Sequence, residues 1–201
     1  MNNPYLTEYL ALPDEDPMFS DMLPTGKRRY DKITFKDYRQ ELVTKYAWAV
    51  PSHEVICKLA VRHKRIVEIG AGTGYWAWML KQTGVDVVCY DKHPPSRRKL
   101  NNWGHHIKTW HPVRKGNHKA VRLHPDRTLL LCWPPYDSDM AFNCLINYTG
   151  NKLIFIGEGD GGCTANDKFF ERLNHEWNFE NEYNIPQWES IHDAVYEYVR
   201  R

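Results

Sequence analysis

Three glycines at alternate positions give this sequence its clearest chemical signal. Gly70, Gly72 and Gly74 follow the β-branched run 65–69 and precede an apolar stretch that begins at Trp76. Because glycine has no Cβ, it lets the backbone pass close to a ligand where any side chain would collide. Placed between a strand and a helix, the glycines predict a loop that lines a ligand site. An ordinary turn in an α/β protein is the alternative.

Asp91 supplies an acid at the position that a ribose-binding site needs. It follows the apolar run 85–90 and stands 21 residues after Gly70, close to the roughly 20-residue spacing of acids that bind ribose hydroxyls. A carboxylate accepts both hydrogen bonds of a vicinal diol better than a neutral side chain does. A dinucleotide site would read Gly-x-Gly-x-x-Gly, which requires a glycine where Tyr75 stands. We therefore expect a ligand that carries a ribose but is not a dinucleotide.

A second stretch, Trp133-Pro134-Pro135-Tyr136-Asp137, follows the apolar run 128–132. Paired prolines stiffen a loop, and an aromatic ring offers a face for a planar group. The indole of Trp133 donates one hydrogen bond and accepts none, so it cannot orient an amino group by accepting from it. Trp133 and Tyr136 could instead form the walls of a site for an aromatic or cationic substrate. Core packing is the alternative for Trp133.

Two acids stand where they could serve as a base or a hydrogen-bond acceptor. Asp137 ends the proline loop, and Glu158 lies between Gly157 and Gly159 after the next apolar run, 152–156. Glycines on both sides would permit a ligand to approach Glu158 closely. A solvated surface turn is the alternative.

The run from Glu68 to Gly74 reads acid-x-Gly-x-Gly-x-Gly and resembles the first motif of the class I S-adenosylmethionine-dependent methyltransferases. The resemblance implies S-adenosylmethionine as the methyl donor and S-adenosylhomocysteine as the product. It implies that Glu68 comes near the donor's amino group through water or backbone, that the glycines line the methionine and ribose, and that Asp91 holds the ribose. The donor-site residues expected on this basis are Glu68, Gly70, Ala71, Gly72, Thr73, Gly74, Asp91, Lys92 and Trp133.

The proline loop resembles the Asn-Pro-Pro-Tyr or Asp-Pro-Pro-Tyr motif of methyltransferases that act on exocyclic or amide nitrogen, with Trp133 in place of the polar first residue. Residues 46–201 as a whole resemble methyltransferase-like proteins of phage and fungi, a likeness that assigns no substrate. The resemblance implies transfer to nitrogen of a planar substrate, either a nucleic acid or nucleotide or a small molecule. A non-catalytic binding or scaffold protein that keeps the fold is the alternative. The expected catalytic residues are Trp133, Pro134, Pro135, Tyr136, Asp137 and Glu158.

Alternating strands and helices must position these residues. Short apolar runs predict strands at 65–69, 85–90, 128–132, 152–156, 179–185 and 194–199. Apolar spacing predicts helices at 35–49, 76–83 and 166–177, and a further helix that begins after a Ser52 cap. This alternation is typical of a doubly wound, mostly parallel α/β sheet, whose carboxyl-end loops share one cleft. The resemblance implies a seven-stranded Rossmann-like sheet with helices on both faces and an antiparallel last strand.

The proline-containing N-terminus predicts an irregular extension at residues 1–34, followed by a single domain at 35–201. In related folds the helix before the first strand covers the donor, so Tyr46 or Trp48 could do so here. Core packing is the alternative for both.

The charge of the chain is balanced overall but uneven along it. A net charge of +2 gives no whole-protein field that favours nucleic acid. Residues 92–122 nonetheless hold nine Lys and Arg residues with Trp103 and Trp110 among them, a pattern that could track phosphates and stack on bases. A solvated connector, or a segment that covers the donor's adenine, is the alternative. The histidines of this segment lack metal-ligand spacing, so no metal is expected.

Several classes of protein are disfavoured by composition. The longest apolar runs are only of strand length, too short to span a bilayer. The first residues lack the basic and apolar regions of a signal peptide. The five scattered cysteines form no C-x-x-C pair and indicate reduced thiols. These features predict a cytoplasmic protein without a membrane partner.

Overall fold

The structure, a computed structural model, describes residues 1–12, 35–95 and 108–201. Within them a seven-stranded sheet has the order β3-β2-β1-β4-β5-β7-β6. Strand β7 is antiparallel to β5 and β6, and the other neighbouring strands pair in parallel. The predicted doubly wound sheet with an antiparallel last strand is confirmed. The strands are β1 Arg65–Ile69, β2 Asp86–Asp91, β3 Val113–Lys115, β4 Thr128–Cys132, β5 Lys152–Gly157, β6 Trp177–Asn184 and β7 Ala194–Arg200.

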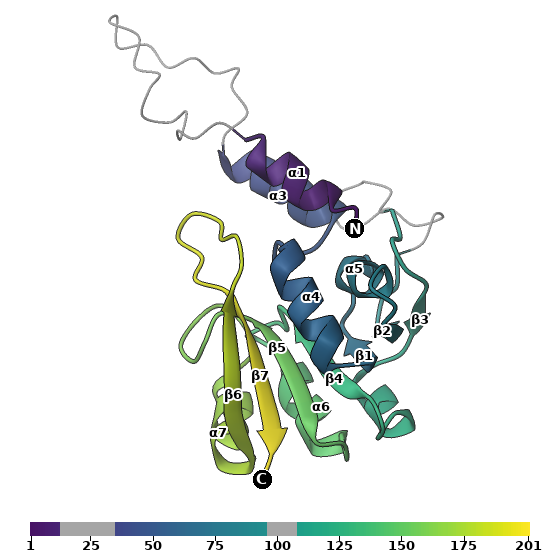
Figure 1. Cartoon of the computed structure of the whole chain (residues 1–201). Helices are drawn as coiled ribbons and strands as arrows, with labels where there is room; N and C mark the ends of the chain where they lie inside the picture. The colour runs from purple at the N-terminus through teal and green to yellow at the C-terminus, as the bar shows by residue number, and fades with distance from the viewer. Residues whose placement is uncertain (13–34, 96–107) are drawn as a thin grey trace, which may run out of the picture.

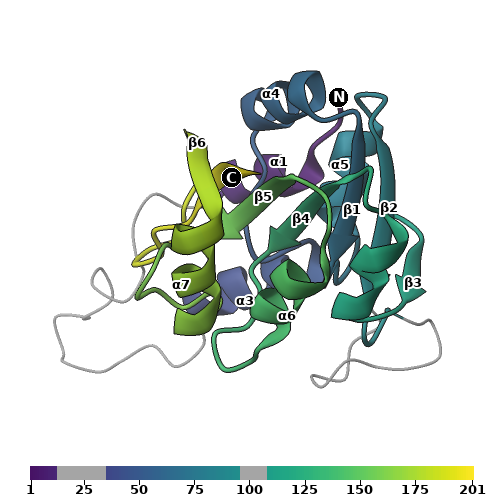
Figure 2. The same ribbon diagram turned by 90° about the horizontal axis from the view of Figure 1, so that it is seen from below.

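Helices cover both faces of the sheet. Helices α4 and α5 lie on one face, and α6 and α7 lie on the other (Figure 2). Helices α1 and α3 lie beyond the edge at which the parallel strands end (Figure 1). The described helices are α1 Pro4–Leu10, α3 Phe35–Lys45, α4 His53–Arg62, α5 Tyr75–Lys81, α6 Met140–Asn147 and α7 Asp167–Glu176, with a 3-10 helix η1 at His118–Leu123.

The central strands are apolar at nearly every position because both of their faces are covered. Ile66 and Leu130 belong to the core cluster that contains the apolar side chains of α4 and α5, whereas Val67 and Leu129 belong to the cluster that contains those of α6 and α7. Successive side chains of a strand point to opposite faces, so a strand buried on both sides has a continuous apolar run. Glu68 interrupts this run, and its side chain is nonetheless buried.

Local signals set the helix starts. The Ser52 hydroxyl accepts a hydrogen bond of 3.2 Å from the Val55 N–H, which confirms the predicted cap of α4. The Asn166 side chain caps α7 in the same way. Such a side chain satisfies one of the free N–H groups that every helix start exposes.

The prediction of an irregular N-terminus is wrong for residues 4–10, which form α1. Tyr5 on this helix is fully buried and stacks on Tyr46, with ring centres 4.8 Å apart. This helix therefore packs into the domain core. The rest of the predicted extension, residues 13–34, lies outside the described residues. The helix predicted at 35–49 ends at Lys45.

Candidate functional site

The loops after β1, β2, β4 and β5 meet at one edge of the sheet, because these strands run in parallel and end there. Open parallel sheets bind ligands at this edge. Helices α1 and α3 stand above it (Figure 1). The loop segments that the sequence predicted to bind and react therefore lie at the same end of the molecule.

The glycine loop has the backbone that its sequence requires. Gly70, Gly72 and Gly74 have φ angles of +77°, +52° and +74°, in the left-handed region that favours glycine. The N–H groups of Gly70 and Ala71 both donate to the carbonyl oxygen of Tyr90, at 2.8 and 3.1 Å. A Cβ built on Gly72 would meet no atom within 4 Å. The loop is thus tied to β2 and faces open space at Gly72.

Asp91 ends β2 beside this open space. Its Oδ2 accepts a hydrogen bond of 3.0 Å from the Gly72 N–H, and its Oδ1 accepts one of 2.7 Å from the His93 N–H. The carboxylate is half-buried, and Lys92 beside it is exposed. Thr73 is buried, and its hydroxyl donates to the Tyr46 carbonyl oxygen just after α3. The structure therefore joins the glycine loop, Asp91 and the end of α3.

Glu68 lies within the core beside the glycine loop. Its carboxyl group is buried, and the Cys89 thiol donates to Oε2 at 3.7 Å. Burial is the main reason that the pKa of Glu68 rises to about 8. At neutral pH the carboxyl group is therefore mostly protonated. Its position indicates support of the loop from within the core.

The proline loop is held in a strained shape. Trp133 has a φ of +49°, in the left-handed region that bulky residues rarely adopt. Its N–H donates to the Ile156 carbonyl oxygen at 2.8 Å, and the Pro134 carbonyl oxygen accepts from the Ala165 N–H at 2.8 Å. Pro135 forms an isolated bridge with Thr164. These bonds to β5 and to the segment after it fix the direction in which the Trp133 indole points.

Trp133 belongs to a cluster with Trp48, Arg39 and Asp193 that the sequence did not predict. Its ring stacks on Trp48, with centres 5.3 Å apart and planes at 17°. Its Nε1–H donates to Asp193 Oδ2 at 2.9 Å. The Arg39 guanidinium lies 5.5 Å from the Trp48 ring centre and 5.9 Å from the Trp133 ring centre. Tyr46 is buried in the core, whereas Trp48 is 45% exposed at the site edge.

Arg39 and Asp193 were not predicted as site residues from the sequence. Asp193 stands just before β7, 60 residues from Trp133, and no local motif surrounds it. Arg39 lies on α3, on a helix predicted only from its apolar spacing. The fold brings both to Trp133.

Tyr136 and Asp137 have no contact with this cluster among the described ring contacts and hydrogen bonds. Tyr136 is 63% exposed, and Asp137 is exposed. Neither side chain has a hydrogen-bond partner among the residues that the structure describes. Their catalytic roles remain predictions, and the two residues could act only on a ligand that reaches them from solvent.

Glu158 holds two loops together. Its Oε1 accepts from the His192 N–H at 2.9 Å, and its Oε2 accepts from the Cys163 N–H at 2.7 Å. Burial alone would raise the pKa of Glu158, but the hydrogen bonds from these backbone groups lower it below its ordinary value. Because its pKa is lowered and its oxygens hold the backbone of two loops, this carboxylate is better suited to positioning the loops than to accepting a proton.

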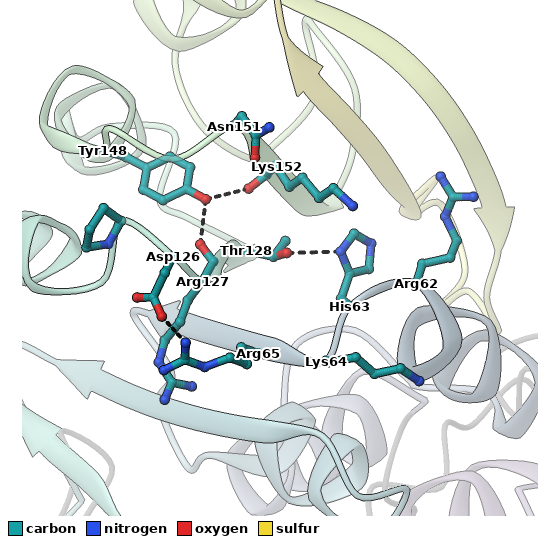
Figure 3. A pocket seen from close by; sticks show the side chains of 11 residues that line it. Arg62, His63, Lys64, Arg65, Asp126, Arg127, Thr128, Tyr148, Asn151 and Lys152 are labelled. Carbon is teal, nitrogen blue, oxygen red and sulfur yellow. Dashed lines mark hydrogen bonds and ion pairs between the residues drawn. The ribbon is translucent and has the colours of Figure 1, made fainter.

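A cavity of about 300 Å³ lies at the opposite edge of the sheet (Figure 3). Its lining comes from the residues at the start of β1, β4 and β5, namely Arg65, Thr128 and Lys152, and from the end of α4, including His63. It is therefore separate from the glycine loop and from Trp133.

The other features considered in the sequence add no residue to this site among the residues that the structure describes. Part of the basic run 92–122, residues 96–107, lies outside the described residues. In the part that is described, the Lys108 ammonium lies 3.6 Å from the Trp110 ring centre. No cluster of three or more His, Cys, Asp or Glu side chains suited to a metal occurs in the described ranges. The helices of those ranges are also too short or too polar to cross a membrane.

No family model and no curated protein matches the sequence. Solved structures do match. The 1,6-didemethyltoxoflavin-N1-methyltransferase of Burkholderia thailandensis, solved with 1,6-didemethyltoxoflavin and S-adenosylhomocysteine, is 13% identical, with 74% of this chain and 77% of that chain covered and a TM-score of 0.50. A TehB-like SAM-dependent methyltransferase of Corynebacterium glutamicum is 17% identical, with 74% and 86% covered and a TM-score of 0.48.

The 23S rRNA methyltransferase ErmE is also 17% identical, with 75% of this chain and 69% of that chain covered and a TM-score of 0.45. At such identities a likeness shows the fold alone. The likeness to the Burkholderia enzyme, together with the strand order, shows that the chain has the Rossmann-like fold of class I S-adenosylmethionine-dependent methyltransferases. The fold that the glycine motif implied is confirmed.

Proposed function

We propose that this protein is an S-adenosylmethionine-dependent methyltransferase that transfers the methyl group to a nitrogen atom. The arrangement of Gly72 and Asp91 supports the donor site, and the resemblance of the proline loop to motifs of nitrogen methyltransferases supports the acceptor atom. The glycine faces open space, and the carboxylate beside it is fixed by the glycine N–H at 3.0 Å. The strand order of the sheet supports the same class of enzyme.

The residues at this edge fit the donor. Each Asp91 oxygen accepts one hydrogen bond from the backbone, and a carboxylate oxygen can accept a second from a ribose hydroxyl. The absence of a side chain at Gly72 leaves room for the ligand beside the backbone. When bound, the donor would supply an activated methyl group on its sulfonium, with S-adenosylhomocysteine as the leaving product.

The protein's task in such a reaction is alignment. Trp133, held by backbone bonds to β5, places a rigid ring at the end of β4. Its Nε1–H is used by Asp193 and one ring face stacks on Trp48, so an acceptor would contact the ring where Trp48 does not cover it. In this proposal, contact with the ring takes the place of the hydrogen-bond acceptor that related motifs have at this position. Nucleic acid as the carrier of the acceptor stays a prediction that depends on the basic run 92–122.

Calorimetry with S-adenosylhomocysteine tests the donor site. We expect the wild-type protein to bind it and the double variant Gly72→Val, Asp91→Ala to lose binding, because the variant fills the open space and removes the ribose acceptor. Phe179→Leu, an exposed change on β6, is the control and should bind as the wild type does. A wild-type protein that fails to bind, or a double variant that binds unchanged, would favour the non-catalytic scaffold instead.

A further inference from the structure

Trp48 and Trp133 form a stacked pair that already holds a cation. The Arg39 guanidinium lies within 6 Å of both ring centres, at 5.5 and 5.9 Å, the range in which a cation is attracted to the face of an indole. Its Nε is buried without a hydrogen-bond partner among the described residues. Within the described residues, Arg39 thus contacts the two rings and has no polar partner for its Nε.

Asp193 adds a negative charge behind this pair. It is 1% exposed, and its Oδ1 has no hydrogen-bond partner within the described part of the chain. Buried polar atoms without partners are uncommon in folded proteins. Burial raises the pKa of Asp193 to about 6, against the opposing effect of the hydrogen bond from Trp133. The group is thus mostly ionised at neutral pH.

The bond between Asp193 and the indole also changes the ring. A carboxylate that accepts the Nε1–H, at 2.9 Å, draws the proton outward and makes the ring face more negative. Cations bind such a face by electrostatic attraction, and they bind more strongly as it becomes more negative. A neutral planar group gains stacking from the rings but nothing from the charge of Asp193.

We propose that Trp48, Trp133 and Asp193 bind a guanidinium or ammonium group of the methyl acceptor, and that Arg39 occupies this position until the acceptor displaces it. This inference rests on the proposed function, since it names the substrate class of the same site. It assigns to Arg39 a role as an internal competitor, and to Asp193 a role in positioning Trp133 and in attracting the cation.

Two probes of the same shape test the charge requirement. N-acetylarginine amide carries a guanidinium, and N-acetylcitrulline amide carries the neutral urea in its place. In calorimetry with saturating S-adenosylhomocysteine, we expect the arginine probe to bind about tenfold more tightly or better, as cation–π and charge contributions of this size imply. Equal binding of the two probes, or tighter binding of adenosine than of the arginine probe, would overturn the proposal.

Variants test each member of the site. Arg39→Met removes the internal cation at similar length and should tighten arginine-probe binding about three- to tenfold, whereas Arg39→Lys keeps a cation and should change it little. Trp48→Leu, at a half-exposed position, should weaken binding of the arginine probe about three- to tenfold. Asp193→Asn keeps an acceptor for the indole but removes the charge, so the preference for arginine over citrulline should shrink. Phe179→Leu is the neutral control.

The two proposals fail in different ways. S-adenosylhomocysteine binding is measured on each variant without the probes, and we expect that of Arg39→Met and Asp193→Asn to stay within about twofold of the wild type, because neither residue belongs to the glycine loop. Loss of product binding in the wild type contradicts the proposed function. Normal product binding with no response of the arginine probe to Arg39→Met or Trp48→Leu contradicts only the cation site.

Discussion

Gly72 and Gly84 have similar backbone strain, but only Gly72 lies where a ligand would make contact. Both have positive φ angles, +52° and +85°, and a Cβ on either would meet no atom within 4 Å. An alanine in the left-handed region costs about 1–2 kcal/mol at each position. Only Gly72 lies beside Asp91, where its N–H donates to the carboxylate. The empty space beside Gly72 is therefore the space in which we place the donor.

We expect Gly72→Ala to lower S-adenosylhomocysteine affinity by tenfold or more, because a methyl group would stand where the ligand passes. Both variants should destabilise the fold by about 1–2 kcal/mol. Gly84→Ala should leave the affinity for S-adenosylhomocysteine unchanged. Calorimetry and denaturant unfolding of both variants check this pair. Equal loss of affinity in the two variants would mean that strain, and not contact, explains the effect.

Glu68 should make stability depend on pH. The pKa of its buried carboxyl group is about 8 in the folded chain, above the ordinary value of 4.5. The raised pKa means that its contribution to stability is complete below pH 4.5 and is lost as pH rises through 8. Glu68→Gln cannot ionise, so its free energy of unfolding should fall less over that window. The difference is on the order of a few kcal/mol, since one pKa unit corresponds to about 1.4 kcal/mol.

Urea unfolding at several pH values between 4.5 and 8.5 measures this difference. Glu171→Gln, a change of an exposed side chain on α7, is the matched control and should give the wild-type pH dependence. Parallel curves for Glu68→Gln and the wild type would show that Glu68 ionises freely in the folded state.

The donor side of the site was predictable because its chemistry is local in sequence. Glycine spacing and the strand before it specify a loop that any parallel sheet places at its carboxyl edge, and Asp91 follows at a fixed distance. The acceptor side depends on long-range contacts. The hydrogen bond from Trp133 to Asp193 joins the residue just after β4 to the residue just before β7, and no spacing rule connects them.

Helix α1 shows how tertiary contact stabilises a short element. Its seven residues are too few for a stable isolated helix. Tyr5 docks it: the ring stacks on Tyr46, the Tyr5 N–H donates to the Tyr75 hydroxyl at 3.1 Å, and Trp188 Nε1 donates to the Tyr5 hydroxyl at 3.2 Å. Tyr5 is thus the buried anchor of the helix, and Leu6 and Tyr9 pack against the core beside it.

Tyr5→Ala should lower the free energy of unfolding by about 3–5 kcal/mol, as for other large-to-small changes of buried aromatics. Leu10→Ala on the same helix changes a side chain that is 70% exposed, so its effect should stay within about 0.5 kcal/mol. Thermal or urea unfolding compares them. Similar small effects for both would mean that α1 packs loosely on the domain.

The elements that the sequence predicted well are those with strong apolar patterns. Strands β1, β2, β4 and β5 are covered on both faces, so their runs are unmistakable. Helix α1 was missed because the prolines near it suggested irregular chain, although Asn3 as a cap and Pro4 in the first turn are a helix-start signal. Strand β3 has only three residues and pairs in parallel with β2 alone, so no pattern could mark it.

Glu197 connects parts of the fold that are distant in sequence. On β7, it is buried and bonds to His63 at the end of α4. The other His63 nitrogen lies 3.0 Å from the Thr128 hydroxyl on β4 (Figure 3). The second carboxylate oxygen of Glu197 accepts hydrogen bonds from the side chains of Asn181 and Tyr183 on β6, each at 2.8 Å. Strands β6 and β7 and the end of helix α4 are thereby joined by a single carboxylate.

This network should govern unfolding in acid. Burial alone would raise the pKa of Glu197, but hydrogen bonds from His63 and Tyr183 and the charge of Arg62 outweigh it and lower the pKa to about 2. A lowered pKa contributes stability that is present above pH 4.5 and is lost as pH falls through 2. Glu197→Gln should therefore lose about 3 kcal/mol at pH 7, as expected when a buried ion pair loses one partner, and should fall less steeply in acid.

Glu180→Gln provides the matched control, because Glu180 also pairs with Arg62, at 2.9 Å, but is 40% exposed. An exposed pair contributes between about 0 and 1 kcal/mol, so this variant should follow the wild-type acid curve. Urea unfolding from pH 7 to pH 2 compares the three proteins. If Glu197→Gln and Glu180→Gln unfold alike, the buried carboxylate does not couple α4 to β6 and β7. A large effect confined to Glu197 would instead show that acid separates this half of the sheet from its covering helix.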